Sequence, residues 1–333
     1  MWPFKLILVF AAVFAFGVPA PARSNNSPIL VIESYHAEYA WDAAYKRGLQ
    51  RVLGDRYTLR FFQMNTKRLL PAEYATQADL AWQCYLKTQP QLVILGDDNA
   101  LKYLGPRFLE TETPTIYLGI NNNPRAYLGR RAREITGVLE RPLIKRSVPV
   151  IFQLVNEPLK KLLVMFDSGT TSKVSLSHLF QNKSQTRLEN VEVHLRFIGD
   201  WDEWRQTVLS AKEDGYGAIV IGLYHTINDK SGQHVNEDEV LAWTSQHTPV
   251  PPFGFWDFSV GVNKTIGGLV LFGESQGTAA AGIALQILED GKQPREIYPV
   301  IGDRGRYLFS RSGLERFKLT LPDFIRSQSS FTE

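Results

Sequence analysis

Cysteine is nearly absent from this sequence. The 333 residues include a single cysteine, Cys84, so no disulfide can form within the chain. Cys84 lies in a helix-like stretch, ADLAWQCYLK, where a free cysteine is more often a small buried hydrophobe than a reactive thiol. Without disulfides the chain depends on its hydrophobic core; among exported proteins, this is more typical of a bacterial periplasm than of disulfide-stapled secreted domains.

Excess charge and catalytic motifs are also lacking. With 37 Lys and Arg against 34 Asp and Glu, the formal net charge is only +3, too small to indicate nucleic acid or an anionic membrane as partner. The sequence has no G-x-S-x-G, no H-E-x-x-H, no phosphate loop ending in Gly-Lys-Ser/Thr and no G-x-G-x-x-G after a predicted strand. We therefore expect no enzyme activity, no cofactor and no metal site. A hydrolase site built from a pair of carboxylates is the alternative that the sequence does not exclude.

The one long apolar run stands at the N-terminus. The segment MWPFKLILVFAAVFAFGVPAPARS has a basic residue, Lys5, then an apolar stretch from Leu6 to Val18, then the small-residue pattern Ala20-Pro21-Ala22. This is the layout of a secretory signal peptide, and the run is shorter than the roughly 20 residues that a membrane span needs. We expect residues 1–22 to be cleaved and the mature protein to be soluble in the periplasm; a retained anchor is the alternative.

Short apolar runs alternate with amphipathic helical patterns along the rest of the chain. ILVIE, TLRFFQM, QLVILG and TIYLG are each a predicted strand, and helix-like segments such as WDAAYKRGLQRVL lie between them. The pattern restarts with KLLVMFD, VEVHLRFI, GAIVIGLY and PPFGFW. This alternation predicts an α/β protein with two Rossmann-like lobes, each built on a parallel sheet that helices cover on both faces.

Polar and aromatic residues follow the predicted strands, at the place where open parallel sheets bind ligands. Turns favour Gly, Asn, Asp and Ser for backbone reasons, so the aromatic residues in SYHAEYAW and GFWD are the more informative part of the pattern. Aromatic side chains supply a large apolar area, and Ser and His can orient the polar end of a ligand. The predicted ligand-binding residues are Ser34, Tyr35, His36, Trp41, Asp97, Asp98, Asn99, Asn121, Asn122, Ser168, Thr170, Thr171, Tyr224, His225, Trp256 and Asp257.

Several of these residues also have a purely structural explanation. Asn99 can cap the helix expected to follow it, and the segment from Ser168 to Ser172 has the composition of a helix N-cap. His36 and His225 are more often hydrogen-bonded turn residues than ligands to a metal. Trp41 stands at the start of an amphipathic helical pattern, so burial in the hydrophobic core is an alternative role for it.

Three segments resemble the periplasmic substrate-binding proteins of ABC transporters that have the type I fold, in particular the members that bind aromatic amino acids. They are GVLERPLIKR at the expected passage between lobes, the SGTTS turn, and GGLVLFGESQGTAAAGIALQILEDGKQPREI, a Gly-rich strand followed by a long helix. The resemblance covers the whole mature chain. It implies a hinge crossed three times, with lobe 1 at 27–142 and 262–293 and lobe 2 at 143–261 and 294–330.

The resemblance also implies a function and roles for particular residues. The protein would close its two lobes on a small polar ligand, an amino acid or similar, and deliver it to an ABC permease, itself remaining a monomer. The ligand carboxylate would be held by the Ser/Thr turn at Ser168, Thr170 and Thr171. The first-strand turn at Ser34, Tyr35 and His36 would line the cleft.

The segments SYHAEYAW and GDDN differ from the amino-acid importers and resemble relatives found near, or fused to, bacterial sensor proteins. A ligand-sensing subunit for a histidine kinase is therefore the alternative function, and a hydrolase or lyase acting in the cleft is a less favoured one. Asp97 and Asp98 offer carboxylates to a cationic group of the ligand. Tyr35 and Trp256, each at the carboxyl end of a predicted strand, are expected to face each other across the cleft.

Overall fold

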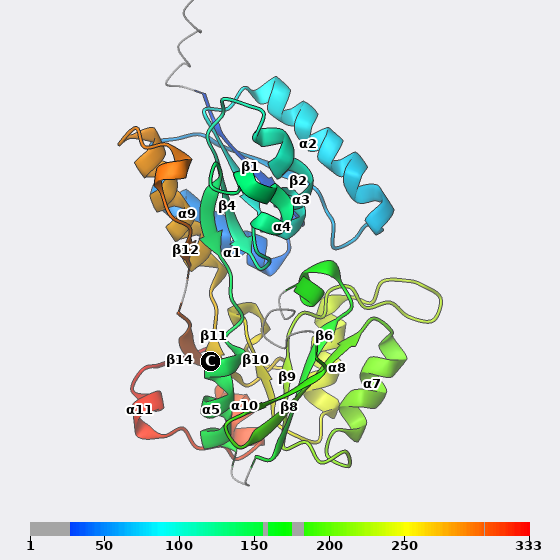
Figure 1. Cartoon of the computed structure of the whole chain (residues 1–333). Helices are drawn as coiled ribbons and strands as arrows, with labels where there is room; N and C mark the ends of the chain where they lie inside the picture. Colours follow the sequence, from blue (N-terminus) through cyan, green and yellow to red (C-terminus); the bar gives the residue numbers. More distant parts are fainter. Residues whose placement is uncertain (1–26, 156–158, 175–182, 303) are drawn as a thin grey trace, which may run out of the picture.

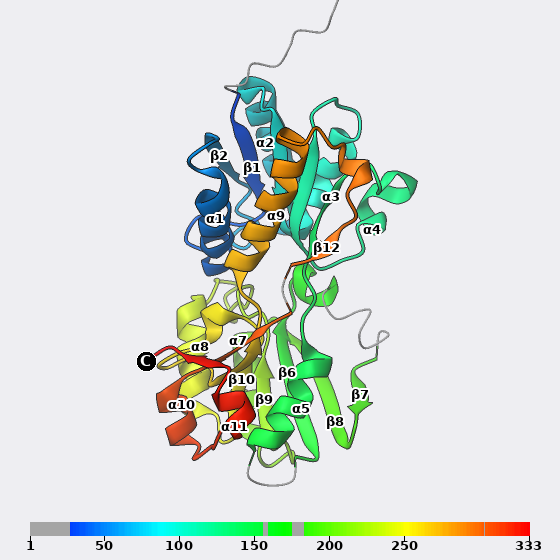
Figure 2. The ribbon, with the colours of Figure 1, turned by 90° about the vertical axis from the view of Figure 1, so that its left-hand side faces the viewer.

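The computed structural model describes residues 27–155, 159–174, 183–302 and 304–333. Within these residues the chain forms two α/β lobes, one above the other in Figure 1, which are joined by several extended segments. The predicted leader at 1–22 lies outside the described residues, as does most of the helix expected after the SGTTS turn. The predicted fold class, two lobes with parallel α/β sheets, is confirmed (Figures 1 and 2).

The first lobe contains a six-stranded sheet in which all neighbouring strands are parallel, in the order β12-β5-β4-β3-β1-β2. Parallel neighbours end at the same edge of a sheet, so the loops after β1, β3, β4 and β5 meet at one edge, which faces the second lobe (Figure 1). The strands are β1 (Ile29–Glu33), β2 (Leu59–Gln63), β3 (Leu92–Gly96), β4 (Thr115–Ile120), β5 (Thr136–Leu139) and β12 (Val300–Ile301).

Helices cover both faces of this first sheet. Alternate residues of β1 enter two separate clusters of the core, one shared with α1 and α9 and the other with α2 and α3. A strand buried on both faces favours apolar residues at successive positions, which explains the continuous run ILVI at the start of β1. The four helices are α1 (Ala40–Leu53), α2 (Tyr74–Thr88), α3 (Asp97–Phe108) and α9 (Gly273–Leu288).

Two glycines allow α1 and α9 to pack at very close range. A Cβ atom on Gly48 would lie 2.2 Å from the carbonyl oxygen of Glu274, and one on Gly277 would lie 1.9 Å from the carbonyl oxygen of Tyr45. The backbones of the two helices therefore touch at this crossing. The Gly- and Ala-rich composition of GESQGTAAAGIAL is thus a packing requirement that holds the returning helix to the first lobe.

The second lobe contains a five-stranded sheet in the order β10-β9-β6-β8-β7, parallel except for the hairpin between β7 and β8. The four predicted strands are present, but β7 was not predicted, because it is a half-exposed edge strand without an apolar run. The elements are β6 (Lys161–Asp167), β7 (Gln185–Leu188), β8 (Val191–Ile198), β9 (Ala218–Ile221), β10 (Pro252–Gly254), α5 (Ile144–Leu154), α7 (Trp201–Ser210) and α8 (Glu237–His247).

A small third sheet, in the order β11-β13-β14, lies with the second lobe (Figures 1 and 2). Just before β11, the amide of Ile266 donates to the carbonyl of Pro252 at 2.7 Å, beside β10. The strands are β11 (Gly267–Val270), β13 (Arg306–Phe309) and β14 (Ser329–Phe331). The remaining short helices are η1 (Pro71–Glu73), α4 (Arg125–Leu128), η2 (Gly129–Arg131), η3 (Asp257–Ser259), η4 (Pro294–Glu296), α10 (Arg311–Arg316) and α11 (Asp323–Arg326).

The boundaries drawn from the sequence differ from the structure at two strands. Segment 262–293 was predicted to return as a whole to the first lobe, but β11 stays beside β10 and only α9 packs on α1. Segment 294–330 was predicted to lie in the second lobe, but β12 pairs with β5 in the first sheet. The reason is that the chain enters the first lobe at α9. It then returns toward the second lobe along the free edge of β5, where it forms β12, before it reaches β13.

Candidate functional site

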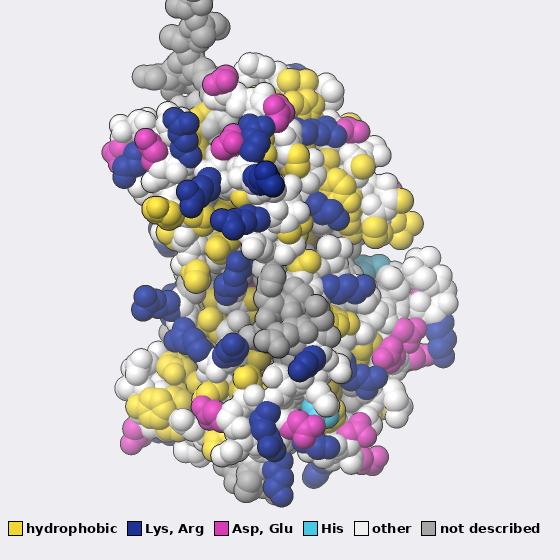
Figure 3. Space-filling view, viewed as in Figure 1, with side chains coloured by type: hydrophobic (Ala, Val, Ile, Leu, Met, Phe, Trp, Pro, Cys, Tyr) yellow, Lys and Arg dark blue, Asp and Glu magenta, His cyan; other side chains and the backbone are white. Residues whose placement is uncertain are grey.

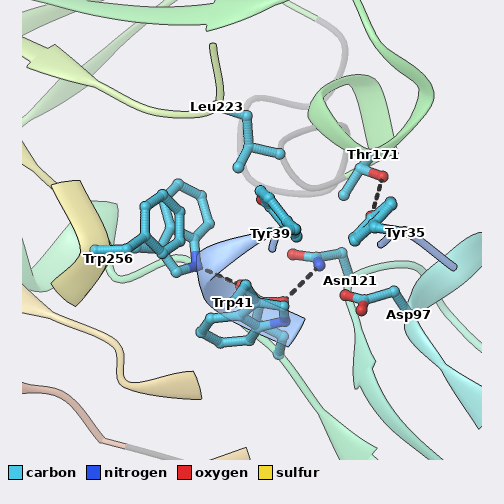
Figure 4. A pocket seen from close by; sticks show the side chains of 10 residues that line it. Tyr35, Tyr39, Trp41, Asp97, Asn121, Thr171, Leu223 and Trp256 are labelled. Carbon is cyan, nitrogen blue, oxygen red and sulfur yellow. Dashed lines mark hydrogen bonds between the residues drawn. The ribbon is translucent and has the colours of Figure 1, made fainter. Parts of the chain in front are cut away.

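A pocket lies between the two lobes, where loops after β1, β3, β4 and β5 meet loops after β6, β9 and β10 (Figure 4). Side chains fill it so that only about 10 Å³ stays free, about the room that one water needs. A ligand of amino-acid size therefore enters only when the lobes part or the rings turn. The lining residues are Tyr35, Tyr39, Trp41, Asp97, Asn121, Glu140, Thr171, Leu223, Trp256 and Phe258.

Aromatic side chains of the first-strand turn bridge the two lobes. The hydroxyl groups of Tyr35 and Thr171 lie 2.9 Å apart. The ring of Tyr39 meets Tyr35 edge-on at 5.0 Å and meets His225 of the second lobe edge-on at 4.8 Å. The ammonium of Lys67 lies 4.8 Å from the centre of the Tyr35 ring, on the first-lobe side. These contacts hold the lobes in a closed arrangement.

Trp256 stands on the opposite side of the pocket from Tyr35 (Figure 4). It follows β10, and its ring meets that of Phe166 edge-on at 6.1 Å and stacks near Phe258 at 6.2 Å. Only 2 % of its surface is exposed. Trp256 is thus a wall of the pocket and, at the same time, part of the core of the second lobe.

Glu140 accepts hydrogen bonds from residues of both lobes in the pocket. The sequence reasoning missed this residue. Its two carboxyl oxygens accept from the indole N–H of Trp256 at 2.6 Å and from the amide of Asn121 at 2.9 Å. Burial raises the pKa of Glu140 to about 7, and these two hydrogen bonds oppose the rise. The signal was available, because Glu140 directly follows β5 just as the predicted residues follow their strands.

Asp97 is a buried acid at the first position of α3. Its backbone has φ of +66°, the left-handed region that Asp and Asn tolerate better than most residues. Burial raises the pKa of its carboxyl well above the usual range, and the nearby acids Asp42 and Glu140 raise it further. One of its oxygens, Oδ2, is buried and has no hydrogen-bond partner among the described residues.

Two other polar atoms of the pocket lining are buried without a hydrogen-bond partner among the described residues. The indole N–H of Trp41 and the side-chain oxygen of Asn121 are buried and lack a hydrogen-bond partner within the described part of the chain. Buried polar groups are almost always hydrogen-bonded, so three such atoms in one pocket suggest that a ligand is their partner. The set comprises two acceptors, on Asp97 and Asn121, and one donor, on Trp41.

Gly119 leaves the space that brings Asp97 and Trp41 together. It has φ of +70°, and a Cβ atom there would lie 2.9 Å from Oδ1 of Asp97 and 3.4 Å from the indole nitrogen of Trp41. A side chain at this position would meet both strain and a clash. The glycine that ends TIYLG is therefore a requirement of the pocket as well as of the turn.

The structure brings six of the predicted residues to the pocket and leaves ten outside its lining. The six are Tyr35, Trp41, Asp97, Asn121, Thr171 and Trp256. Sequence reasoning had noted Tyr39 as an aromatic of the turn without selecting it, and it missed Glu140, Leu223 and Phe258. Leu223 carried no signal, because an apolar residue after β9 looks like the end of the strand.

Four of the predicted first-lobe residues hold loops in place instead of lining the pocket. Ser34 donates to the carbonyl of Gly96 at 2.6 Å and accepts from the amide of Ala100 at 2.8 Å. Asp98 accepts from the amides of Asn121 and Asn122, at 3.0 Å each. Asn122 also accepts from the amide that follows it, and Asn99 donates to the hydroxyl of Thr66 at 2.8 Å.

The two histidines and Tyr224 lie behind the pocket. Burial, and then the positive charge of Arg68, lower the pKa of His36 to about 4, and burial lowers the pKa of His225 well below its usual range. The rings of Tyr224 and His225 stack at 4.2 Å in the second lobe. Both histidines are thus neutral packing residues beside Tyr39, and within the described ranges no cluster of His, Cys, Asp or Glu is placed to hold a metal.

The Ser/Thr turn of the second lobe is organised by Asp167, which the sequence reasoning did not select. Its carboxylate accepts from the amide of Gly169 at 3.1 Å and the amide of His225 at 2.8 Å, and from the hydroxyl of Ser172. Two hydrogen-bond donors of this turn, the amide of Gly169 and the hydroxyl of Ser172, are therefore already used by the carboxylate of Asp167. Ser168 is half-buried and Thr170 exposed, and both lie outside the pocket lining.

Asp257 also lies outside the lining. Its carboxylate accepts from the amide of Phe258 at 3.0 Å, and burial raises its pKa to about 6. It positions Phe258, which does line the pocket. Among the described residues, no helix is both long and apolar enough to cross a bilayer.

Solved structures resemble this chain over most of its length, although no protein-family model and no curated protein matches the sequence. One is the ABC domain in complex with L-Trp from Streptococcus pneumonia (TM-score 0.67, 16% identity, 92% of this chain and 99% of that chain). A conserved domain protein from Vibrio cholerae gives a TM-score of 0.69 at 15% identity, over 92% of this chain and 100% of that one.

A third similar structure is the ligand-free, open form of CD0873, a substrate-binding protein with adhesive properties from Clostridium difficile. It gives a TM-score of 0.63 at 13% identity, over 92% of this chain and 99% of that one. At such identities the similarity shows the fold and not the ligand. The chain has the type I periplasmic binding protein fold, the class that the sequence resemblance indicated.

Proposed function

We propose that this protein is an exported solute-binding protein that closes its two lobes on a small ligand carrying an ammonium group, such as an amino acid or a similar compound, and delivers it to an ABC transporter. Residues 1–22 would serve as a cleavable signal peptide, and the mature chain would act in the periplasm. The structural neighbours are ligand-binding proteins of the same fold, which supports a binding role.

The observation that carries this proposal is the buried carboxyl of Asp97. It is 2 % exposed, and one of its oxygens has no hydrogen-bond partner among the described residues. A buried carboxyl group gains most from a partner that brings both N–H donors and positive charge. The unpartnered oxygen of Asn121 is a second acceptor for the same ammonium group.

The rest of the pocket fits the remainder of such a ligand. Tyr39, Trp41, Trp256 and Phe258 provide aromatic faces, which suit an apolar or aromatic portion and attract an ammonium group. The indole N–H of Trp41 is free to donate to a carboxylate or carbonyl oxygen of the ligand. Thr171, which the sequence resemblance had linked to a carboxylate, lines the same pocket.

A thermal-shift screen of amino acids, amines, organic acids and sugars tests the proposal. A ligand that binds only the folded state raises the melting temperature, so compounds with an ammonium group should raise it and those without one should not. The variant Asp97→Asn should lose the shift, with affinity weaker by at least about 2 kcal/mol for loss of a buried charge partner. Asn suits the positive φ of Asp97, so the backbone should be retained.

The matched control is Asp290→Asn, which removes one carboxylate from an exposed position far along the chain, after α9. This variant should keep the full shift. A melting temperature raised only by sugars, or retained ligand shifts in Asp97→Asn, would contradict the ammonium model. Conversion of a bound compound into a product would instead favour the enzyme alternative.

Experiments in cells distinguish a role in transport from a role in sensing. Deletion of the gene should abolish uptake of the labelled ligand if the protein serves an ABC transporter. Unchanged uptake, with loss of ligand-dependent phosphorylation of a histidine kinase, would assign the sensing role that the SYHAEYAW and GDDN segments suggested.

A further inference from the structure

A second concavity lies on the first lobe, away from the pocket between the lobes. It has a cavity volume of about 320 Å³ and is bordered by β5, the segment before α4, and the segment between η4 and β12. Its floor is apolar, with Ile135, Leu139 and Ile297, and Tyr117 lies among them. We call it the β12 groove; its further lining residues are Asn123, Pro124, Arg125, Ala132, Arg133, Thr136, Arg295, Tyr298 and Pro299.

Three arginines surround the β12 groove. Arg125, Arg133 and Arg295 are exposed, and none of them forms an ion pair within the part of the chain that the structure describes. The adjacent acid Glu134 is paired with Arg131 at 2.7 Å, and it also interacts with Arg295 electrostatically. Figure 3 shows dark blue side chains over the first lobe, with yellow and magenta ones among them. Among the described residues, the lining of the groove therefore includes three arginines and no acidic residue.

Large apolar side chains continue from the groove onto the neighbouring surface. Tyr298 is 83% exposed, Ile301 62% and Val300 41%. The last two form β12, the outermost strand of the first sheet. Exposed apolar side chains at an open sheet edge are unusual unless a partner covers them. Tyr and Arg are also the residue types that dominate protein interfaces.

One residue of the groove lining, Tyr117, has a buried hydroxyl group. Tyr117 is fully buried, and its hydroxyl has no hydrogen-bond partner among the described residues. Buried polar groups of this kind are normally paired.

We infer that the β12 groove is the docking site for an acidic, extended segment of another protein, which places an apolar side chain in the cavity and carboxylates against Arg125, Arg133 and Arg295. Charge complementarity argues for the acidic partner. The concave floor argues against a membrane surface, because a bilayer is met by protruding apolar side chains and leaves a cavity unfilled. This inference goes beyond the proposed function and does not depend on the identity of the solute.

An array of short synthetic peptides tests the inference with the full mature chain. Each peptide has one central Phe or Leu, flanked either by Asp and Glu or by the uncharged Asn and Gln. The acidic set should be retained about tenfold more strongly, and Arg125→Glu/Arg295→Glu should remove that preference. Tyr298→Ser, at an exposed position, should weaken retention without affecting the fold.

The matched control is Arg187→Glu/Lys212→Glu, which reverses two exposed charges on the second lobe and gives the same net charge. It should leave the preference unchanged. The inference is overturned if the uncharged peptides bind equally, if no peptide is retained, or if the control loses binding as the groove variant does. It is also overturned if phosphatidylglycerol vesicles, and not peptides, bind in a way that the groove variant abolishes.

Discussion

The hydroxyl group of Tyr35 lies 2.9 Å from that of Thr171, and this hydrogen bond ties the first lobe to the second across the pocket. Tyr35 comes from the turn after β1 and Thr171 from the turn after β6, so the bond forms only when the lobes are closed. It is therefore a contact whose energy contributes to closure and not to the folding of either lobe.

Tyr35→Phe should weaken ligand binding more than it weakens the unliganded protein. Loss of one hydrogen bond costs about 1 kcal/mol, which corresponds to roughly fivefold in affinity. Isothermal titration with any ligand from the thermal-shift screen measures the first effect, and the urea midpoint without ligand measures the second.

The control for this variant is Tyr85→Phe. Tyr85 pairs with the hydroxyl of Thr113 at 2.8 Å, and both residues belong to the first lobe. Its loss should lower the urea midpoint and leave ligand affinity unchanged. Equal effects of the two variants on affinity would show that the Tyr35 bond has no special part in closure.

Trp256→Ala should destabilise the unliganded protein severely. The sequence alone suggested that Trp256 served the cleft, so its loss would matter mainly with ligand bound. The structure instead buries its ring against Phe166 and Phe255, and such a deletion costs roughly 3–5 kcal/mol. Urea unfolding without ligand measures the loss. A cost below about 1 kcal/mol would place Trp256 outside the core.

Glu140 should make the stability of the protein fall as the pH rises from about 4.5 to 7, whereas His36 and His225, whose pKa values are lowered in the folded state, should oppose this fall. Burial raises the pKa of Glu140 from 4.5 to about 7, so this group binds more protons in the folded state than in the unfolded state between these values. The stabilisation is complete below pH 4.5, declines as the pH rises through 7, and is lost above that. At 1.36 kcal/mol per pKa unit the change is about 3 kcal/mol at most.

Glu140→Gln keeps the shape of the side chain and removes this titration. As the pH rises from 4.5 to 8, the urea midpoint of the unaltered protein should therefore fall relative to that of the variant. Asp97, Asp42 and the two histidines also have shifted pKa values, but their contributions are common to both proteins and cancel in this comparison. Identical pH profiles for the two proteins would show that Glu140 does not titrate in this range.

The mature protein should begin near Arg23 and occur in the periplasmic fraction. The layout of residues 1–22 predicts cleavage after the small-residue pattern that ends at Ala22. Intact mass of the purified native protein measures the N-terminus directly. A membrane-bound protein that retains residues 1–22 would support the anchor alternative.

The order of apolar runs and helical patterns was sufficient to predict two α/β lobes. Strands buried on both faces favour continuous apolar runs, and this local requirement is visible in ILVI of β1 and LLVMF of β6. The same order predicted the location of the pocket, because parallel strands end at one edge of a sheet. Tyr35, Trp41 and Trp256 were found in this way.

The sequence could not decide which polar residue at a strand end turns inward. Asp97 and Asp98 are neighbours of the same type, yet Asp97 lines the pocket and Asp98 accepts from the amides of Asn121 and Asn122. The difference arises from the positive φ of Asp97 and the space above Gly119, which are set by how β3 and β4 lie side by side.

Contacts between distant segments were decided only by the tertiary structure. Glu140 became central because Trp256, 116 residues further along the chain, donates to it from the other lobe. β12 joined the first sheet because α9 packs on α1 and directs the chain back along β5. Local sequence fixes what a segment prefers to be, but burial and hydrogen-bond pairing between lobes depend on the whole chain at once, and these determine the pocket.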